Sequence, residues 1–295
     1  MSISASDITK LREATGAGMM DCKNALEEAN GDTTLAEEIL RKKGIIKAEK
    51  RASKISAEGT VVVKNQDNFA VVVEINSETD FVAKNEDFKV LTEKLTATIL
   101  TNKPASPEVA LMEKMNDMEE TVKEYLDIAM AKIGEKISLR RFKVMEKTGA
   151  DTFGLYSHMG GKIGVLLVLE NSSDEALARD ICMHIAASNP KYLNREVVDT
   201  AELDKEREIY TAQLKQEGKP ENIIENILKG KINKFYSENC LLEQAYIKDE
   251  DKTIIKLLTE AGENVKIREF VRFELGEGME KKKQDFASEV AEQLG

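Results

Sequence analysis

The feature that most constrains this chain of 295 residues is a pattern of a hairpin, helices and a third strand that occurs twice. Alternating, β-branched residues predict the hairpins at 59–75 and 153–169. The third-strand segments start at Gly134 and Gly262 with similar sequences, GEKISLR and GENVKIR. We interpret this recurrence as an internal duplication, which predicts an α+β core of two related subdomains made of antiparallel strands with helices.

The distances between matching positions locate an insertion in the second copy. Asp174 follows Asp80 by 94 residues, whereas Gly262 follows Gly134 by 128, an excess of 34 residues. Residues 201–238 fit this excess, because they contain two helical patterns, each with one narrow apolar seam, joined by a Gly-Lys-Pro turn. They predict an antiparallel coiled-coil arm that projects from the core. The seams comprise Leu203, Tyr210 and Leu214, then Ile224, Leu228, Ile232 and Phe235.

Residues 7–43 precede the core and show three short helical periodicities, which predict a small helical module. Gly44 is expected to end the third helix. Residues 41–54 contain seven Lys or Arg and one acid, so this stretch carries +6 and the rest of the chain −17. We interpret it as a solvated linker, helical or not, whose charge can steer an acidic partner.

Composition excludes several classes of function. The net charge of −11 argues against direct nucleic-acid binding, which needs a basic surface. No apolar run reaches the roughly 18–20 residues that a membrane span requires. Cys22, Cys182 and Cys240 are far apart and suggest a reducing compartment. Without a recognisable signal or transit segment, we expect a cytoplasmic protein.

Residues suited to enzyme chemistry are scarce. The chain has two histidines, and His184 lies on an apolar helical stripe, which favours a buried structural role. Gly16 and Gly18 lack the frame of a dinucleotide loop, and Gly160-Gly161-Lys162 lacks that of a phosphate loop. We therefore expect no catalytic residue, no cofactor, no metal site and no small-molecule substrate.

The pair Asp80-Phe81 follows a strand and opens a helix, so it should stand at a corner of the fold. Two interpretations are open. Asp80 could cap the helix while Phe81 folds back on the core. Alternatively, Phe81 could project outward and enter a pocket on a partner. His158, at the end of a strand, is either an ordinary turn residue or another contact residue.

Two longer motifs carry a resemblance to a known family. Residues 11–23, LREATGAGMMDCK, and residues 79–84, TDFVAK, resemble the two signatures of the elongation factor Ts family. Gly276-Glu277-Gly278 is also similar to that family. The resemblance covers nearly the whole chain.

This resemblance implies a fold and its boundaries. It implies a three-helix module like a ubiquitin-associated (UBA) domain, which we place with the basic linker at 1–54. The first core subdomain would cover 55–148. The second would cover 149–275, with the coiled-coil arm inserted, and a C-terminal helical segment would cover 276–295.

The resemblance also implies a function: guanine-nucleotide exchange on elongation factor Tu, the one partner we expect. In that family the pair matching Asp80 and Phe81 enters beside the nucleotide site and disturbs its magnesium ion. The implied contact residues are Thr79, Asp80, Phe81, Val82, His158, Met19 and Met20. Two rival classes are a scaffold that binds Tu without exchange, and an enzyme with an unrecognised site.

Overall fold

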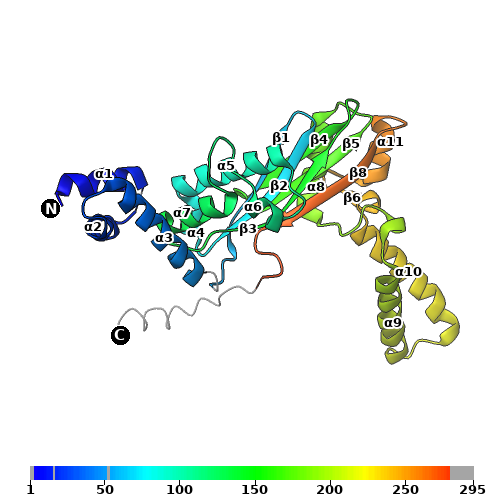
Figure 1. Cartoon of the computed structure of the whole chain (residues 1–295). Helices are drawn as coiled ribbons and strands as arrows, with labels where there is room; N and C mark the ends of the chain where they lie inside the picture. Colours follow the sequence, from blue (N-terminus) through cyan, green and yellow to red (C-terminus); the bar gives the residue numbers. More distant parts are fainter. Residues whose placement is uncertain (1–2, 16, 52–53, 280–295) are drawn as a thin grey trace.

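The computed structural model describes residues 3–15, 17–51 and 54–279, and it has a mixed α+β architecture. Helices occupy the N-terminal end, two antiparallel sheets form the centre, and a helical hairpin projects at the far end (Figure 1). The predicted α+β class is confirmed at this level. Residues 280–295, most of the expected C-terminal helical segment, lie outside the described residues.

The N-terminal helices are α1 (Ala5–Thr15), α2 (Met19–Glu28) and α3 (Thr33–Arg51). They enclose a small apolar core of Leu11, Cys22, Ala25, Leu26, Ala29 and Ala36. The expectation that Gly44 ends the third helix is wrong, because α3 continues to Arg51. Gly44 instead packs against Ala131, because an added Cβ would lie 3.3 Å from the Cβ of that residue.

The first sheet has the order β1-β2-β3, with every neighbouring pair antiparallel. Its strands are β1 (Glu58–Gln66), β2 (Phe69–Ser77) and β3 (Ser138–Glu146). Between β2 and β3 come α4 (Asp80–Lys84), α5 (Glu86–Asn102), α6 (Pro107–Met112) and α7 (Val122–Ile133).

The second sheet repeats this arrangement, with the order β4-β5-β8. Its strands are β4 (Thr152–His158), β5 (Ile163–Glu170) and β8 (Lys266–Glu274). Before β8 come α8 (Glu175–Ser188), η1 (Arg195–Val197), α9 (Thr200–Gln216), α10 (Glu221–Asn239), η2 (Leu241–Glu243), β6 (Ala245–Tyr246), β7 (Asp249–Thr253) and α11 (Ile254–Ala261).

The two sheets share a local irregularity. In the first, the pairing of β2 with β3 shifts just before Ile75, which pairs with Leu139. In the second, the pairing of β5 with β8 shifts just before Leu169, which pairs with Ile267. These pairs are related by the same 94- and 128-residue offsets that the sequence shows. The hairpins differ, because the second has a longer connection, Met159 to Lys162.

The central strands are buried on both faces. One face of each sheet packs against the other sheet, through residues such as Val72 of β2 and Leu166 of β5. The opposite faces pack against helices, α5 in the first sheet and α8 in the second. Gly164 permits the close approach of the sheets, since an added Cβ would lie 2.5 Å from Cγ1 of Val61.

Helices α9 and α10 form the projecting hairpin (Figure 1). Five of the seven apolar residues predicted to form its seam are buried: Leu203, Leu214, Ile224, Ile232 and Phe235. At the root, the Arg195 guanidinium lies 4.4 Å from the ring of Tyr236 and forms an ion pair with Glu243. Across the described part of the chain, no helix is long and apolar enough to cross a membrane.

Glu74 is a buried carboxylate that links three segments. It accepts hydrogen bonds from Arg140 at 2.7 Å and Arg141 at 2.6 Å on β3, and from the backbone N–H of Gly276 at 2.8 Å. Burial alone would raise the pKa of Glu74, but these three donors outweigh it, so its pKa lies below the ordinary value. The charged carboxylate therefore connects the first sheet to the turn that follows β8.

We predict that Glu74→Ala lowers the free energy of unfolding by about 1.5–3 kcal/mol, because it removes the buried carboxylate that accepts hydrogen bonds from two half-buried guanidinium groups. Urea denaturation at pH 7 measures this. A matched control is Glu119→Ala, whose side chain is 91% exposed and pairs with Lys114 at 2.6 Å. The control should cost no more than about 1 kcal/mol.

The pH dependence provides a second measurement on Glu74. Since its pKa is lower in the folded state, its contribution is present above the unfolded value of about 4.3 and is lost as the pH falls through the folded value. Acidification should therefore reduce the stability of the native protein more than that of Glu74→Ala. Equal losses would contradict the assignment of a stabilising charged carboxylate.

Candidate partner-binding site

The short helix α4 begins directly after β2, and its first turn is fixed by Thr79. The Thr79 hydroxyl accepts a hydrogen bond from the backbone N–H of Val82 at 3.4 Å, which satisfies one free donor of the helix. Val82 is buried and anchors the helix to the first sheet. Asp80 is thus the first helical residue and does not cap the helix.

Phe81 projects away from the protein. Its side chain is 78% exposed, the largest exposed fraction among the large apolar residues of the described chain. The Nζ atom of Lys84 lies 5.9 Å from the ring centroid. The interpretation in which Phe81 folds back on the core is therefore wrong, because Val82 fills the inward position beside it.

Asp80 is charged and accepts a hydrogen bond from Lys84 at 2.8 Å. This hydrogen bond, together with the positive charges of Lys84 and Lys162, holds the pKa of Asp80 below its ordinary value. Lys162 belongs to the turn between β4 and β5, so the second sheet contributes to the electrostatics of α4.

The β4–β5 turn is held against β1. The backbone N–H of Val61 donates to the carbonyl of Gly161 at 2.7 Å, and Lys162 pairs with Glu58 at 2.6 Å. Gly161 has φ +92°, and an added Cβ would lie 2.2 Å from Oγ1 of Thr60. The turn therefore lies at the same end of β1 as α4.

The turn exposes His158 and Met159. The His158 ring stacks on Tyr156 with centroids 5.8 Å apart, and the Tyr156 hydroxyl lies 3.0 Å from Nδ1 of His158. Met159 is 73% exposed and has φ +49°. Sequence reasoning did not single out Met159. The signal available was an apolar residue beside Gly160-Gly161, in a turn longer than its counterpart in the first hairpin.

Met19 and Met20, the first two residues of α2, are also exposed. They lie in the N-terminal helices, apart from α4 and from the β4–β5 turn (Figure 1). The structure thus brings Thr79, Asp80, Phe81 and Val82 together, places the turn of His158 near them, and leaves the two methionines as a separate surface.

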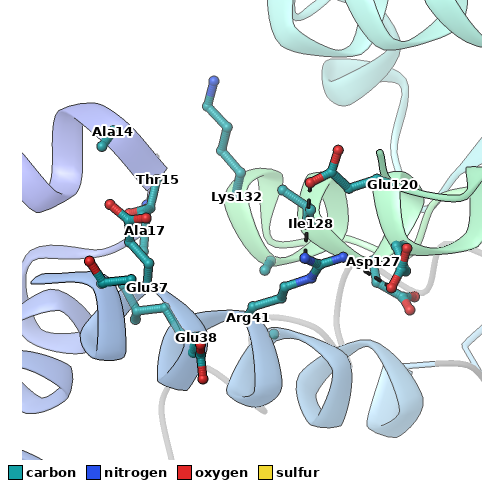
Figure 2. A pocket seen from close by; sticks show the side chains of 15 residues that line it. Ala14, Thr15, Ala17, Glu37, Glu38, Arg41, Glu120, Asp127, Ile128 and Lys132 are labelled. Atoms are coloured by element: carbon teal, nitrogen blue, oxygen red, sulfur yellow. Dashed lines mark hydrogen bonds and ion pairs between the residues drawn. The ribbon is translucent and has the colours of Figure 1, made fainter. Parts of the chain in front are cut away.

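A cavity of about 440 Å³ lies where the N-terminal helices meet α7 (Figure 2). Arg41 of α3 crosses this junction and pairs with Glu124 at 3.0 Å and Glu120 at 4.0 Å. A hydrogen bond from the Thr121 backbone and the charge of Arg41 lower the pKa of Glu124. Residues 41–51 are helical, and Arg41 is ion-paired with the core. The cavity lies between the N-terminal helices and α7, and the ion pair of Arg41 with Glu124 spans it.

The structural role predicted for His184 is confirmed. Its side chain is fully buried, Nε2 lies 2.9 Å from Oε1 of Gln244, and Nδ1 lies 3.4 Å from the backbone N of Ile247. Burial lowers the pKa of His184 and so favours the neutral ring. Among the residues that the structure describes, no group of three or more His, Cys, Asp or Glu side chains could hold a metal ion.

The chain matches a known family. The model of a family described as "Elongation factor TS" matches residues 78–277, about two thirds of the chain. The match includes α4, both third strands, the β4–β5 turn and the projecting hairpin.

The exposure of Phe81 leads to a prediction about stability. Phe81→Ala should change the free energy of unfolding by no more than about 0.5 kcal/mol, because an exposed ring contributes little to the core. Phe88→Ala is the matched control, since Phe88 is fully buried in the same part of the fold. It should cost about 3–5 kcal/mol. Urea denaturation of both variants is the measurement, and comparable losses would contradict the outward position of Phe81.

Proposed function

Because this chain belongs to the elongation factor Ts family, the nucleotide exchange factors of elongation factor Tu in translation elongation, we propose that Asp80 and Phe81 are the residues that drive GDP from Tu. The family membership makes the chain an exchange factor and not an enzyme, with elongation factor Tu as its partner. The residues that carry the activity, and the way they act, are our proposal.

The observation that supports this proposal is the exposed ring of Phe81 on a helix whose first turn is fixed. Thr79 caps the helix, and the buried Val82 anchors it. Transfer of a phenyl ring from water into a partner pocket contributes about 1.5–3 kcal/mol. Since the ring is already held outward, little of this energy is lost in ordering it on binding.

Asp80 would act through charge. A carboxylate beside the nucleotide site competes with the phosphates for the magnesium ion, and a displaced ion no longer neutralises their charge. GDP then binds more weakly. Reciprocity requires that GDP weaken the binding of this protein to Tu by the same factor, so the exchange factor prefers nucleotide-free Tu.

We also propose that the β4–β5 turn contacts the same domain of Tu, through His158 and Met159. Both side chains are exposed, and the turn is fixed to β1 at the end where α4 begins. Met19 and Met20 would contribute a second, separate contact from the N-terminal helices. Their exposure at the start of α2 supports this.

The finer architecture is proposed on the same basis. Residues 1–54 would form a UBA-like module with its linker, 55–148 and 149–275 two related core subdomains, and 276–295 a C-terminal segment. The shared register shift in the two sheets supports the relationship of the subdomains. The buried seam supports a coiled-coil arm at 201–238 that engages the rest of Tu.

Members of this family work in the cytoplasm or in organelles, and we propose the cytoplasm for this chain. Its three cysteines are free, which fits a reducing compartment. The alternative to exchange is a scaffold that binds Tu and leaves GDP release unchanged. Release of a fluorescent GDP from Tu, with and without this protein, distinguishes the two.

We predict that Phe81→Ala loses about 2–4 kcal/mol of interaction with Tu, the range for an interface anchor. The rate of GDP release per unit concentration of factor should then fall roughly thirty- to several-hundred-fold. Met112→Ala is the control, because Met112 is 74% exposed but lies on α6. With Met112→Ala, Tu should release GDP at the same rate as with the native protein. The same rate with Phe81→Ala would refute the proposed role.

We predict that replacing 201–238 by a short turn leaves a cooperatively folded core and reduces GDP release only in part, since Asp80 and Phe81 remain. Thermal melting and fluorescent GDP release are the measurements. A second variant that removes only 208–228 keeps Leu203, Ile232 and Phe235, which pack at the root of the arm. If even this shorter deletion abolished cooperative melting, the arm would be part of the core and the insertion hypothesis would fail.

A further inference from the structure

Two loops that are far apart in the sequence are joined just before α4. The carboxylate of Glu135 accepts two hydrogen bonds from Thr79, one from the hydroxyl at 2.7 Å and one from the backbone N–H at 3.0 Å. In the opposite direction, the carboxylate of Glu78 accepts a hydrogen bond from the backbone N–H of Lys136 at 2.7 Å. We call these three hydrogen bonds the loop bridge.

The loop bridge acts on the residue that sets the direction of α4. Glu135 follows Gly134, which ends α7 with φ +87°, and this left-handed residue turns the chain back toward Thr79. Thr79 is the N-cap of α4, so Glu135 holds the cap by both of its donors. Because α4 has only five residues, it has little helical stability of its own, and its orientation depends on such contacts.

The second half of the core provides an internal comparison. The sequence offsets place Ser173 at the position of Thr79 and Glu263 at that of Glu135. Within the described residues these two are exposed and form no hydrogen bond with each other. The corresponding loops are joined instead by Asn171, whose amide donates to the carbonyl of Asn264 at 3.0 Å. The repeated fold therefore forms without a carboxylate that holds the cap.

The two halves also differ in the helix that follows the second strand of each sheet. In the second half, Asp174 caps α8, a helix of 14 residues, and the next residue is Glu175. In the first half, the bridged cap precedes a short helix that exposes Phe81. The loop bridge thus occurs in the half that presents an aromatic side chain to solvent.

We propose that Glu135 is a positioning residue for nucleotide exchange: it holds Thr79 so that α4 presents Phe81 in a fixed direction to Tu. Glu78 supports it from the opposite loop. This inference rests on the proposed function of Phe81, since a fixed direction matters only if the ring enters a partner. An unbridged α4 would sample other directions, and its ordering on binding would reduce the exchange rate.

The test is a double-mutant cycle on GDP release. Glu135→Ala should reduce the rate about tenfold to a hundredfold, which is less than the loss expected for Phe81→Ala because Glu135 acts through the position of that ring. Glu135→Gln keeps only one suitable acceptor and should lie between Glu135→Ala and the native protein. Glu263→Ala, at the equivalent position of the second half, is the control and should leave the rate unchanged. In a Phe81→Ala background, Glu135→Ala should have no further effect.

The outcomes separate this inference from the proposed function. If Glu135→Ala reduces the rate by the same factor with and without Phe81, Glu135 has a merely structural role and the inference is overturned. If Phe81→Ala slows GDP release from Tu while both Glu135 variants support the native rate, the inference alone is overturned. If Phe81→Ala supports the native rate of GDP release from Tu, the proposed role of Phe81 is overturned, and the inference with it. Should Glu135→Ala not fold, the same cycle with Glu135→Gln decides between these outcomes.

Discussion

The charged carboxylate of Glu74 is the interaction on which the central fold depends. It lies on a strand that is buried on both faces, where an unpaired charge would be strongly destabilising. Its partners are two arginines of β3 and the backbone of Gly276, which follows the last strand of the second sheet. The carboxylate therefore fixes the register of the first sheet and the position of the turn after β8 in one cluster. The Arg141 guanidinium, 4.2 Å from the Phe273 ring, joins the same cluster to the second sheet.

With the sheets fixed face to face, the connections between strands are free to differ in the two halves. The first half has a short helix with an exposed ring after its second strand, and the second half has a long helix at the same place. The projecting hairpin, α9 and α10, lies between α8 and β8, with no counterpart in the first half. The longer β4–β5 turn crosses to β1 and brings Lys162 near Asp80. The candidate site thus draws on both halves.

Much of this could be predicted from the sequence. Alternating apolar residues predicted the hairpins, because this pattern is local in the sequence. The difference between the two repeat offsets located the helices at 201–238, because it requires only the positions of matching residues. The burial of His184 followed from its apolar stripe. The continuation of α3 through Gly44 and the contact of the β4–β5 turn with β1 could not be predicted. Each depends on contacts between segments distant in the sequence, such as Gly44 with Ala131 or Gly161 with Val61.

An exchange factor must bind the nucleotide-free state of its partner, which is sparsely populated while nucleotide is present. Its binding energy is used best when little of it is spent on ordering the exchange factor itself. A flexible aromatic side chain would lose part of that energy in becoming ordered. In this protein the helix that carries Phe81 is already ordered in the folded state, because Thr79 caps it and the buried Val82 anchors it. Exposure of one ring costs the folded state little, because the neighbouring core positions are filled. In the function that we propose, the folded core holds Phe81 outward, so the ring can weaken the binding of the nucleotide to Tu without first becoming ordered.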